Sequence, residues 1–484
     1  MSLSSALYSA MSGIRAASRG SEIVSSNIAN ANTPGYARRT LSISSESGGG
    51  AVGVRINGVV RHIDQQVIND RRLAEAEVGY RSETTSALTR IEDLIGTPNN
   101  AGSLAARVSD FEKSLITATS RPDATERLTS VAFAAKDLAK SINTVAQGIQ
   151  DARTQADRSI DAQVSRLNDA LKGVQTLNAR IVASGRVGTE LSALEDQRQQ
   201  LIDEISAMVP VRAVPRDHGA VALYSTGGAI LLEGGAVEVG FEPTNVVTPY
   251  ASEADGTLSG LTLNGIAVNT SSANGRLHGG TLGAQFEIRD EIAPDAQRQI
   301  DALARDLIGR FEDSNVDPTI AAGEAGLFTD AGAPLDPADE LGLANRISLN
   351  TLVDPDDGGQ TWRIRDGLGA SAPGDVGNGA LLIALTDAFV AQRPQASGDF
   401  GVADLNIDGI VASVSSQLGS DRLRADQQLS FASAQAVELA QIERANGVDT
   451  DAEIQTLMIL EQAYAANARV ISTVDEMFDA LMRI

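Results

Sequence analysis

Histidine is the scarcest side chain that could serve as a general base in this chain, because only His62, His218 and His278 occur among 484 residues. The three lie in segments of different composition, so we expect ordinary surface or loop histidines. Cysteine is absent, which excludes disulfides, thiolate metal ligands and cysteine nucleophiles. The motifs H-E-x-x-H, G-x-S-x-G and G-x-x-x-x-G-K-[ST] are also missing from the sequence. We therefore predict no catalytic residue, no metal and no cofactor.

The acidic run from Asp354 to Gly359 begins like the calcium loop of an EF-hand. Such a loop needs Asp or Asn at its fifth position and Glu at its twelfth, where this chain has Gly358 and Arg365. A solvated loop is the favoured interpretation, and adventitious cation binding is the alternative.

Length and charge limit the class of protein. A chain of 484 residues exceeds what one core usually supports, which suggests two to four domains. The 39 basic and 63 acidic residues give a net charge of −24, which disfavours nucleic-acid binding. No basic leader with an apolar block follows Met1, and no apolar run approaches the roughly 20 residues of a membrane span. We therefore expect neither a cleaved signal peptide nor membrane insertion.

Both ends of the chain carry seam residues at alternating steps of three and four, the spacing of a helix that packs along another helix. Gly13 and Gly20 interrupt the first seam, and Thr450 with Glu453 predicts a capping box at the start of the second helix. The N-terminal seam comprises Leu3, Leu7, Ala10, Ile14, Ala17, Ser21, Val24 and Ile28, and the C-terminal seam comprises Leu457, Leu460, Tyr464, Asn467, Ile471, Val474, Phe478 and Leu481.

The charges of the two ends are opposite. Residues 1–40 hold four arginines against one glutamate, a net of +3, whereas 441–484 hold eight acids against three arginines, a net of −5. This difference favours pairing of the two terminal helices. A seam of this kind is more often an intramolecular core than an intermolecular interface, but its place at both ends of an elongated chain favours an interface.

The middle of the chain changes texture several times. Helical periodicity covers 64–95 and 138–181, and the second stretch would form a rod of roughly 65 Å at about 1.5 Å per residue. Residues 211–277 are Gly-rich with alternating β-branched residues, which is typical of a β domain. Helical patterns return near 300–311 and 405–442.

We therefore predict a mainly α fold class with an inserted β domain, in an elongated multidomain chain with a long-helix bundle. The predicted domains are a terminal coiled-coil domain (1–40 with 447–484), a helical wall domain (41–208 with 280–314 and 379–446), a β-rich outer domain (209–279), and a loop-rich segment or second small insertion (315–378).

The turn after the N-terminal helix carries a recognisable motif. Residues 26–38 read S-N-I-A-N-A-N-T-P-G-Y-A-R and resemble the signature N-I-A-N-x-x-T-P-G-Y of the bacterial flagellar rod and hook axial protein superfamily. The closing stretch 461–478 is similar to the matching C-terminal helix, and 53–94 and 280–284 are similar to the junction members of the superfamily. The signature turn comprises Asn27, Asn30, Thr33, Pro34, Gly35 and Tyr36.

The resemblance implies a non-enzymatic structural subunit that joins hook to filament. It implies terminal helices that pair as a coiled coil along the export channel, are poorly ordered in the free monomer and become ordered on assembly. It also implies an extracellular flagellar location, reached through the flagellar type III export apparatus without a cleaved signal. We expect the assembly interface at Leu3, Leu7, Ile14, Val24, Ile28, Leu457, Leu460, Tyr464, Ile471, Val474, Phe478 and Leu481.

The partners that the resemblance implies are further copies of the chain in a ring or helical assembly, the hook protein, a second junction protein of the hook-associated protein 3 type, and an export chaperone at the C-terminal helix. Two alternatives stay open. One is another axial protein, such as a hook or distal rod subunit, against which the length and the 53–94 match argue. The other is a secreted enzyme with its catalytic domain in 211–375, where no catalytic motif occurs.

Overall fold

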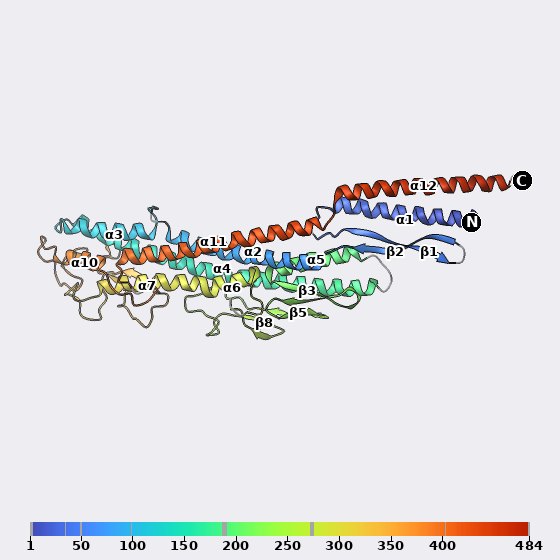
Figure 1. Cartoon of the computed structure of the whole chain (residues 1–484). Coiled ribbons are helices and arrows are strands. Elements are labelled where there is room, and N and C mark those ends of the chain that lie inside the picture. Colours follow the sequence, from blue (N-terminus) through green and yellow to red (C-terminus); the bar gives the residue numbers. More distant parts are fainter. Residues whose placement is uncertain are drawn as a thin grey trace.

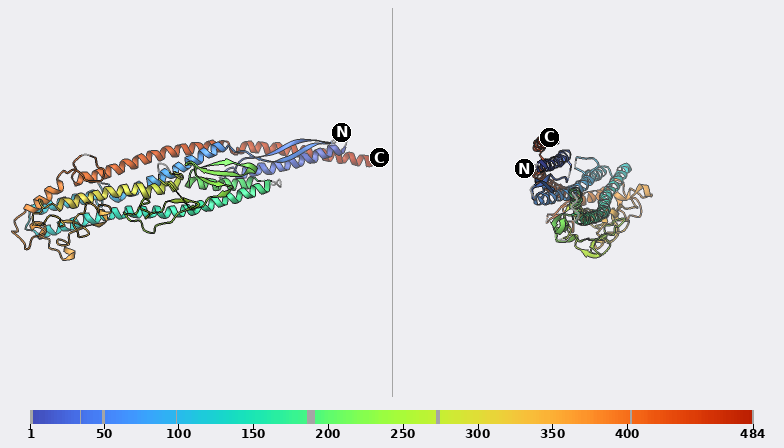
Figure 2. Two further views of the ribbon diagram at one scale, coloured as in Figure 1. Left: turned by 90° about the horizontal axis from the view of Figure 1, so that it is seen from below. Right: turned by 90° about the vertical axis from the view of Figure 1, so that its right-hand side faces the viewer.

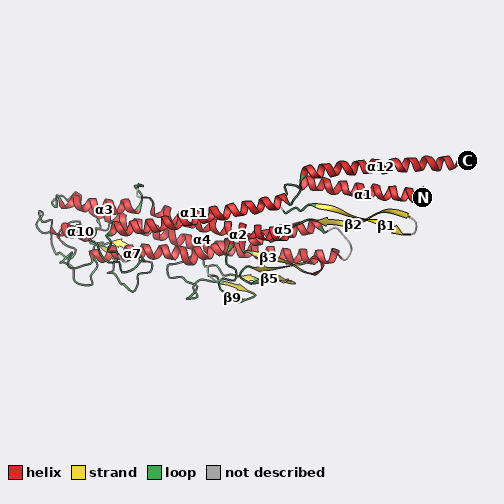
Figure 3. Cartoon of the chain, viewed as in Figure 1, coloured by secondary structure: helices red, strands yellow, loops and turns green. Residues whose placement is uncertain are grey.

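The structure, a computed structural model, describes residues 3–33, 35–48, 51–97, 99–185, 191–271, 275–401 and 403–482, so Pro34 of the signature turn lies outside the described residues. The molecule is elongated, with both termini at one end (Figure 1). Figure 2 shows the same length from below and a compact cross-section from the end. Helices dominate and the strands form small sheets (Figure 3), which confirms a mainly α fold with a β insertion.

The long helices follow the predicted periodic segments. The longest, α4, has 61 residues and spans about 90 Å, which is longer than predicted. The helices are α1 (Leu3–Asn30), α2 (Gln65–Ile95), α3 (Leu104–Thr119), α4 (Thr125–Gly185), α5 (Ser192–Met208), α6 (Gly280–Glu287), α7 (Ala293–Phe311), α8 (Leu343–Arg346), α9 (Arg363–Asp366), α10 (Ala380–Val390), α11 (Ile407–Ala445) and α12 (Thr450–Met482).

The core at the end of the molecule far from the termini packs α3, α7, α10 and parts of α2, α4 and α11 together. Its centre is a group of aromatic rings, in which Phe111 meets Phe311, Phe328 and Phe389 edge to face at 5.3–5.9 Å between centroids. Phe328 belongs to β10 (Phe328–Asp330), which pairs with β11 (Ile347–Leu349). The segment 315–378 is therefore rich in loops, and it contributes side chains to the core of the helical body.

The inserted strands form two antiparallel sheets along one side of α4 (Figure 1). The apolar side chains of both sheets share a second core with α5, α6 and the C-terminal half of α4. The first sheet contains β3 (Val211–Pro215), β4 (Val221–Ser225), β5 (Ile230–Glu233) and β6 (Gly235–Ala236), and the second contains β7 (Val239–Gly240), β8 (Leu261–Leu263) and β9 (Ile266–Val268).

A buried ion pair fastens the insertion to the helices. A π-helical turn, Ile288–Ile292, joins α6 to α7 and carries Arg289, which donates to Asp157 of α4 at 2.7 Å. Both side chains are fully buried. The second oxygen of Asp157 accepts from the backbone N–H of Thr244 at 2.6 Å, and Arg289 donates to the carbonyl of Ser259 at 3.0 Å. The insertion is thus held to α4 through its backbone.

The terminal helices α1 and α12 run antiparallel, side by side, beyond the helical body (Figure 1). The hairpin of β1 (Arg39–Gly48) and β2 (Ala51–Arg61) lies along α1, where the hydroxyl of Ser12 accepts from the backbone N–H of Val54 at 3.1 Å. The antiparallel pairing of β1 and β2 returns the chain along α1. Residues 41–61, which we predict in the helical wall domain, thus pack on a terminal helix. The other predicted domain limits stay predictions.

Candidate assembly interface

The contact between α1 and α12 repeats every seven residues. Gly13 lies against Asn467, Gly20 against Leu460, and Asn27 bonds to Glu453. A Cβ at Gly20 would lie 3.0 Å from both Leu460 Cδ atoms, and one at Gly13 would lie 2.7 Å from Asn467 Nδ2. The two glycines that we expected to interrupt the seam therefore allow the helices to approach closely, which corrects that prediction.

The predicted seam residues differ in burial within the single chain. The exposure of Phe478 and Leu481 follows from the register, because residues beyond Met477 of α12 extend past Leu3 and face no described residue of α1. Val24 and Val474 are buried, Leu3, Leu7, Ile14, Ile28, Leu457, Leu460 and Ile471 are half-buried, and Tyr464, Phe478 and Leu481 are exposed. Their role in assembly stays a prediction.

A second apolar stripe runs along α12 beside the face that contacts α1. Ile459, Ala463, Ala466, Val470 and Met477 share this stripe at helical spacing, and Ile459 is 65% exposed. Within the described part of the chain nothing covers the large side chains of this stripe. Exposed apolar surface is typical of interaction sites when it forms a large patch.

The signature turn closes on Asn27, whose side chain is fully buried. Its amide nitrogen donates to the carbonyl of Arg39 at 2.8 Å and to the Glu453 carboxylate at 2.9 Å. Its amide oxygen accepts from the Arg39 N–H at 3.1 Å and from the Tyr36 hydroxyl at 2.9 Å. A left-handed Gly35, with φ of 77°, turns the chain so that Tyr36 reaches back.

The rest of the turn is held locally. Asn30 donates to the carbonyl of Ser26 at 2.9 Å, and the Thr33 hydroxyl donates to the Asn30 side chain at 3.3 Å. The backbone N–H groups of Thr33 and Tyr36 donate to the carbonyls of Asn30 and Thr33. These bonds satisfy the end of α1, so the signature turn is also the C-terminal stop of the helix.

Glu453 joins the turn to α12 instead of capping its own helix. Its side chain is 2% exposed and accepts from Asn27 and from Arg38 Nε at 2.7 Å. The cap comes from Asp449, whose carboxylate accepts from the N–H groups of Asp451 and Ala452 at 3.0 and 3.1 Å. The predicted capping box is therefore wrong, because the long-range partners take the Glu453 carboxylate.

Asp196 of α5 connects the same turn to the helical body. Its carboxylate accepts from Arg39 Nη2 at 2.5 Å and from Arg61 Nε at 2.8 Å, while Arg61 also donates to the Gln199 side chain at 2.7 Å. The Arg39 guanidinium lies over the Tyr36 ring at 4.7 Å. We name the set Asn27, Tyr36, Arg38, Arg39, Arg61, Asp196 and Glu453 the signature hub.

The signature hub brings together four segments that are far apart in sequence: the end of α1, the open end of the hairpin, α5 and the start of α12. The sequence analysis identified Asn27 and Tyr36 but missed the role of the arginines and of Asp196. The signal that could have found them is the opposition of Arg39 and Arg61 in a hairpin register. Like charges directly opposite each other destabilise a hairpin, so a counter-charge near both arginines could have been expected.

The three histidines lie apart from one another. His62 contacts the Thr40 hydroxyl at the hairpin base, His218 occupies an exposed turn with φ of 57°, and His278 stacks edge to face on Tyr80 before α6. Burial and a hydrogen bond to Glu287 raise the pKa of Tyr80. The His62–Thr40 contact is exposed to solvent.

The acidic run 354–359 binds the ammonium group of Lys136. Lys136 Nζ lies 2.8 Å from Asp354 Oδ2 and 2.8 Å from Asp356 Oδ2, and these bonds raise the pKa of the Lys136 ammonium. Within the described ranges, no group of three or more metal-ligating side chains is placed to hold a metal ion. Among the described helices, none has the length and apolar character to cross a membrane.

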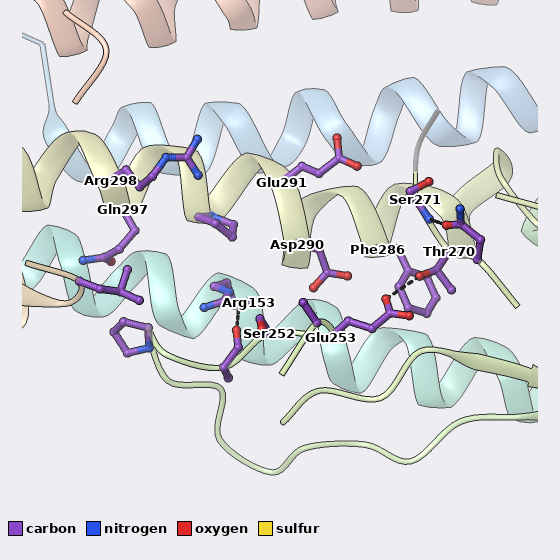
Figure 4. Close-up of a pocket in the computed structure, with 16 residues that line it drawn as sticks. Arg153, Ser252, Glu253, Thr270, Ser271, Phe286, Asp290, Glu291, Gln297 and Arg298 are labelled. Carbon is purple, nitrogen blue, oxygen red and sulfur yellow. Dashed lines mark hydrogen bonds between the residues drawn. The ribbon is translucent and has the colours of Figure 1, made fainter. Parts of the chain in front are cut away.

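A pocket of about 660 Å³ lies between the insertion and the helical segment formed by α6, the π-helical turn and α7 (Figure 4). Its charged side chains serve structural contacts. Arg153 donates to the carbonyls of Thr248 and Ala251 at 3.0 and 2.7 Å, and Glu253 accepts from the Thr270 hydroxyl at 2.8 Å. Among these contacts, the Arg153 bonds join the insertion to α4.

The two ends of the chain match models of flagellar axial proteins. The family "Flagella basal body rod protein" matches residues 7–36, and "Flagellar basal body rod FlgEFG protein C-terminal" matches 442–484. These matches cover the terminal helices and part of the signature hub, and they place the chain in the class of bacterial flagellar axial proteins.

The middle of the chain narrows the class to a family. The model "Flagellar hook-associated protein FlgK helical domain" matches residues 88–327. The chain is 26% identical to flagellar hook-associated protein 1 of Escherichia coli over 100% of both chains. It is 23% identical to the protein of the same name from Bacillus subtilis, over 94% of this chain and 93% of the relative. The chain belongs to the flagellar hook-associated protein 1 family.

A solved structure is also similar to this chain. The flagellar hook junction protein FlgK from Burkholderia pseudomallei superposes with a TM-score of 0.44 at 19% identity, over 55% of this chain and 47% of that chain.

Proposed function

We propose that this chain is a non-enzymatic structural subunit that joins the flagellar hook to the filament. The observation that carries the proposal is the apolar stripe of α12, which stays uncovered in the single chain although its helix belongs to a family of assembly proteins. An uncovered stripe at helical spacing fits the terminal helices of neighbouring copies. The predicted seam residues of both helices would line these contacts.

The heptad register of α1 and α12 supports a coiled-coil pair at the inner face of the assembly. The same exposed stripe would be an aggregation risk before assembly, which supports capture of the C-terminal helix by an export chaperone. Export takes place through the flagellar type III apparatus without a cleaved signal, and the chain reaches the extracellular hook–filament junction. There it contacts the hook protein on one side and a junction protein of the hook-associated protein 3 type on the other.

Deletion of the gene tests this proposal. Cells should carry bare hooks under the electron microscope and release flagellin into the medium, because export continues while the joint is missing. Cells without hooks would move the chain to the rod or hook, and cells with intact filaments would refute the junction role.

A single charge in the terminal seam tests the assembly contact. Ile471→Asp should block incorporation into flagella and leave the helical body folded, because a charge in a desolvated seam costs several kcal/mol. Ser472→Asp places the same charge on the neighbouring exposed position and should incorporate normally. Incorporation is measured by immunoblot of isolated flagella, and equal incorporation of both variants would contradict the role of Ile471.

A further inference from the structure

The outward side of α11 carries a long row of exposed positions without charge. They recur at steps of three and four from 412 to 441, or about 44 Å of helix. The large apolar members are strongly exposed, and Phe431 beside the row is 74% exposed. The row comprises Ala412, Ser416, Ser420, Leu423, Gln427, Ser430, Ala434, Val437 and Gln441. We name this row together with Phe431 the α11 face; Arg424 and Glu438 border it.

The exposed row of α4 provides an internal comparison. It has the same helical spacing, but it carries Asp137, Lys140, Asp151, Arg158 and Asp169. Solvent-exposed helix faces normally carry such charges. The centres of protein interfaces, by contrast, are depleted of charged residues and enriched in aromatic ones. The α11 face shares the lack of charge with such centres, and Leu423, Phe431 and Val437 add large exposed apolar side chains to it.

We infer that the α11 face is a lateral interface with a second copy of this chain, in addition to the contact of the terminal helices. The inference rests on the proposed function, because it needs copies packed side by side. Each copy carries a net charge of −24, so two copies repel wherever their charged faces meet. A charge-free row is the surface on which such copies can approach.

The area of a stable protein interface also supports a second copy of this chain as the partner of the α11 face. The 33 residues of α12 form a stripe about 50 Å long and about 10 Å wide, or roughly 500 Å². Stable interfaces bury about 800 Å² on each partner. The α11 face adds roughly 440 Å² by the same estimate. The two helices follow each other along one edge of the molecule (Figure 1), so one neighbour can cover both.

Photo-crosslinking in assembled flagella tests the inference. Benzoylphenylalanine replaces Phe431 in the full-length chain, which is produced in cells that lack the native gene. Isolated flagella are irradiated, and adducts are identified by mass spectrometry. Phe133 is the matched control, because it is an exposed phenylalanine on the charged row of α4. The expected product joins two copies of this chain through position 431, at a yield at least tenfold above position 133.

Each other outcome decides against the inference. Adducts between position 431 and a different protein, or no adduct above the control, would overturn the lateral contact while leaving the terminal-helix assembly intact. A chain that is exported but absent from flagella in every variant, the unsubstituted one included, would overturn the proposed function itself. A second variant, Val437→Glu, should reduce incorporation at least tenfold, whereas Lys140→Glu on α4 should not.

Discussion

Replacing Asp196 with alanine should release the β1–β2 hairpin from the helical body. The Asp196 carboxylate binds Arg39 and Arg61, which face each other across the open end of the hairpin. The two arginine side chains are only 12% and 9% exposed. In the alanine variant, two nearly buried guanidinium groups would lose the carboxylate that neutralises both.

The free-energy cost of Asp196→Ala depends on the contacts that Arg39 and Arg61 retain. Removing one partner of a buried ion pair costs about 3–5 kcal/mol. Arg39 retains its contact with the Tyr36 ring and Arg61 retains the Gln199 side chain, which favours the lower end of that range. A loss of about 3 kcal/mol corresponds to roughly a 100-fold change in an equilibrium constant, at 1.36 kcal/mol per factor of ten. Asp196→Asn, which keeps an acceptor, should cost roughly half as much.

Hydrogen–deuterium exchange of the full-length chain measures this loss. Backbone amides of β1 and β2 should exchange about 100-fold faster in Asp196→Ala, while those of α4 keep their rates. Gln197→Ala, at an exposed position of the same helix, is the control. Hairpin exchange within threefold of this control would refute the reasoning, because the Asp196 carboxylate would then contribute nothing to holding the hairpin.

Three further changes test the packing of the chain. Gly20→Leu should reduce incorporation into flagella, since even a Cβ at position 20 would lie 3.0 Å from Leu460. Adding Leu460→Ala should restore incorporation. A double variant that incorporates no better than the single one would exclude lack of space as the cause. Asp157→Leu should lower the free energy of unfolding by about 3–5 kcal/mol in urea melts, because it leaves Arg289 buried without its partner. Adding Arg289→Met should recover most of this loss. A double variant as unstable as Asp157→Leu would show that the buried pair is not the source of the loss. Burial raises the pKa of Asp301 to about 6, so its stabilising contribution is full below about pH 4 and is lost as pH rises through 6. Compared with Asp301→Asn, the unsubstituted chain should therefore lose about 3 kcal/mol of unfolding free energy between pH 4 and 7, and a pH-independent difference would contradict this.

The parts of the fold that the sequence predicted are those set by local periodicity. Helix α2 was expected over 64–95 and spans Gln65–Ile95, and the rod of α4 was expected from its apolar repeat. Strands were expected after Val211 and occur there. In each case the side chains that define the pattern are close in sequence, so the preference of the segment is visible without its partners.

Contacts between distant segments could not be predicted from the sequence, because the same residue type fits two structural roles. Gly20 weakens a helix when considered alone, yet it creates space once α12 lies against it. Glu453 has the spacing of a capping residue, but its carboxylate binds Asn27, which is 426 positions away. Spacing shows which face of a helix a residue occupies, whereas the distance to a neighbouring helix depends on the whole fold.

The signature hub explains physically why the turn motif needs its spacing. Asn27 is the one side chain there that both donates twice and accepts twice, to Arg39, Glu453 and Tyr36. Aspartate would lose both donors and place a second carboxylate beside Glu453, and leucine would leave the Arg39 carbonyl and the Glu453 carboxylate unsatisfied in a buried site. The turn at Gly35 must then return the chain over nine residues so that Tyr36 reaches the same amide. One buried amide thus fixes the end of α1, the start of the hairpin and the position of α12 together, which is why the motif occupies consecutive positions of the turn while its partners are dispersed over the chain.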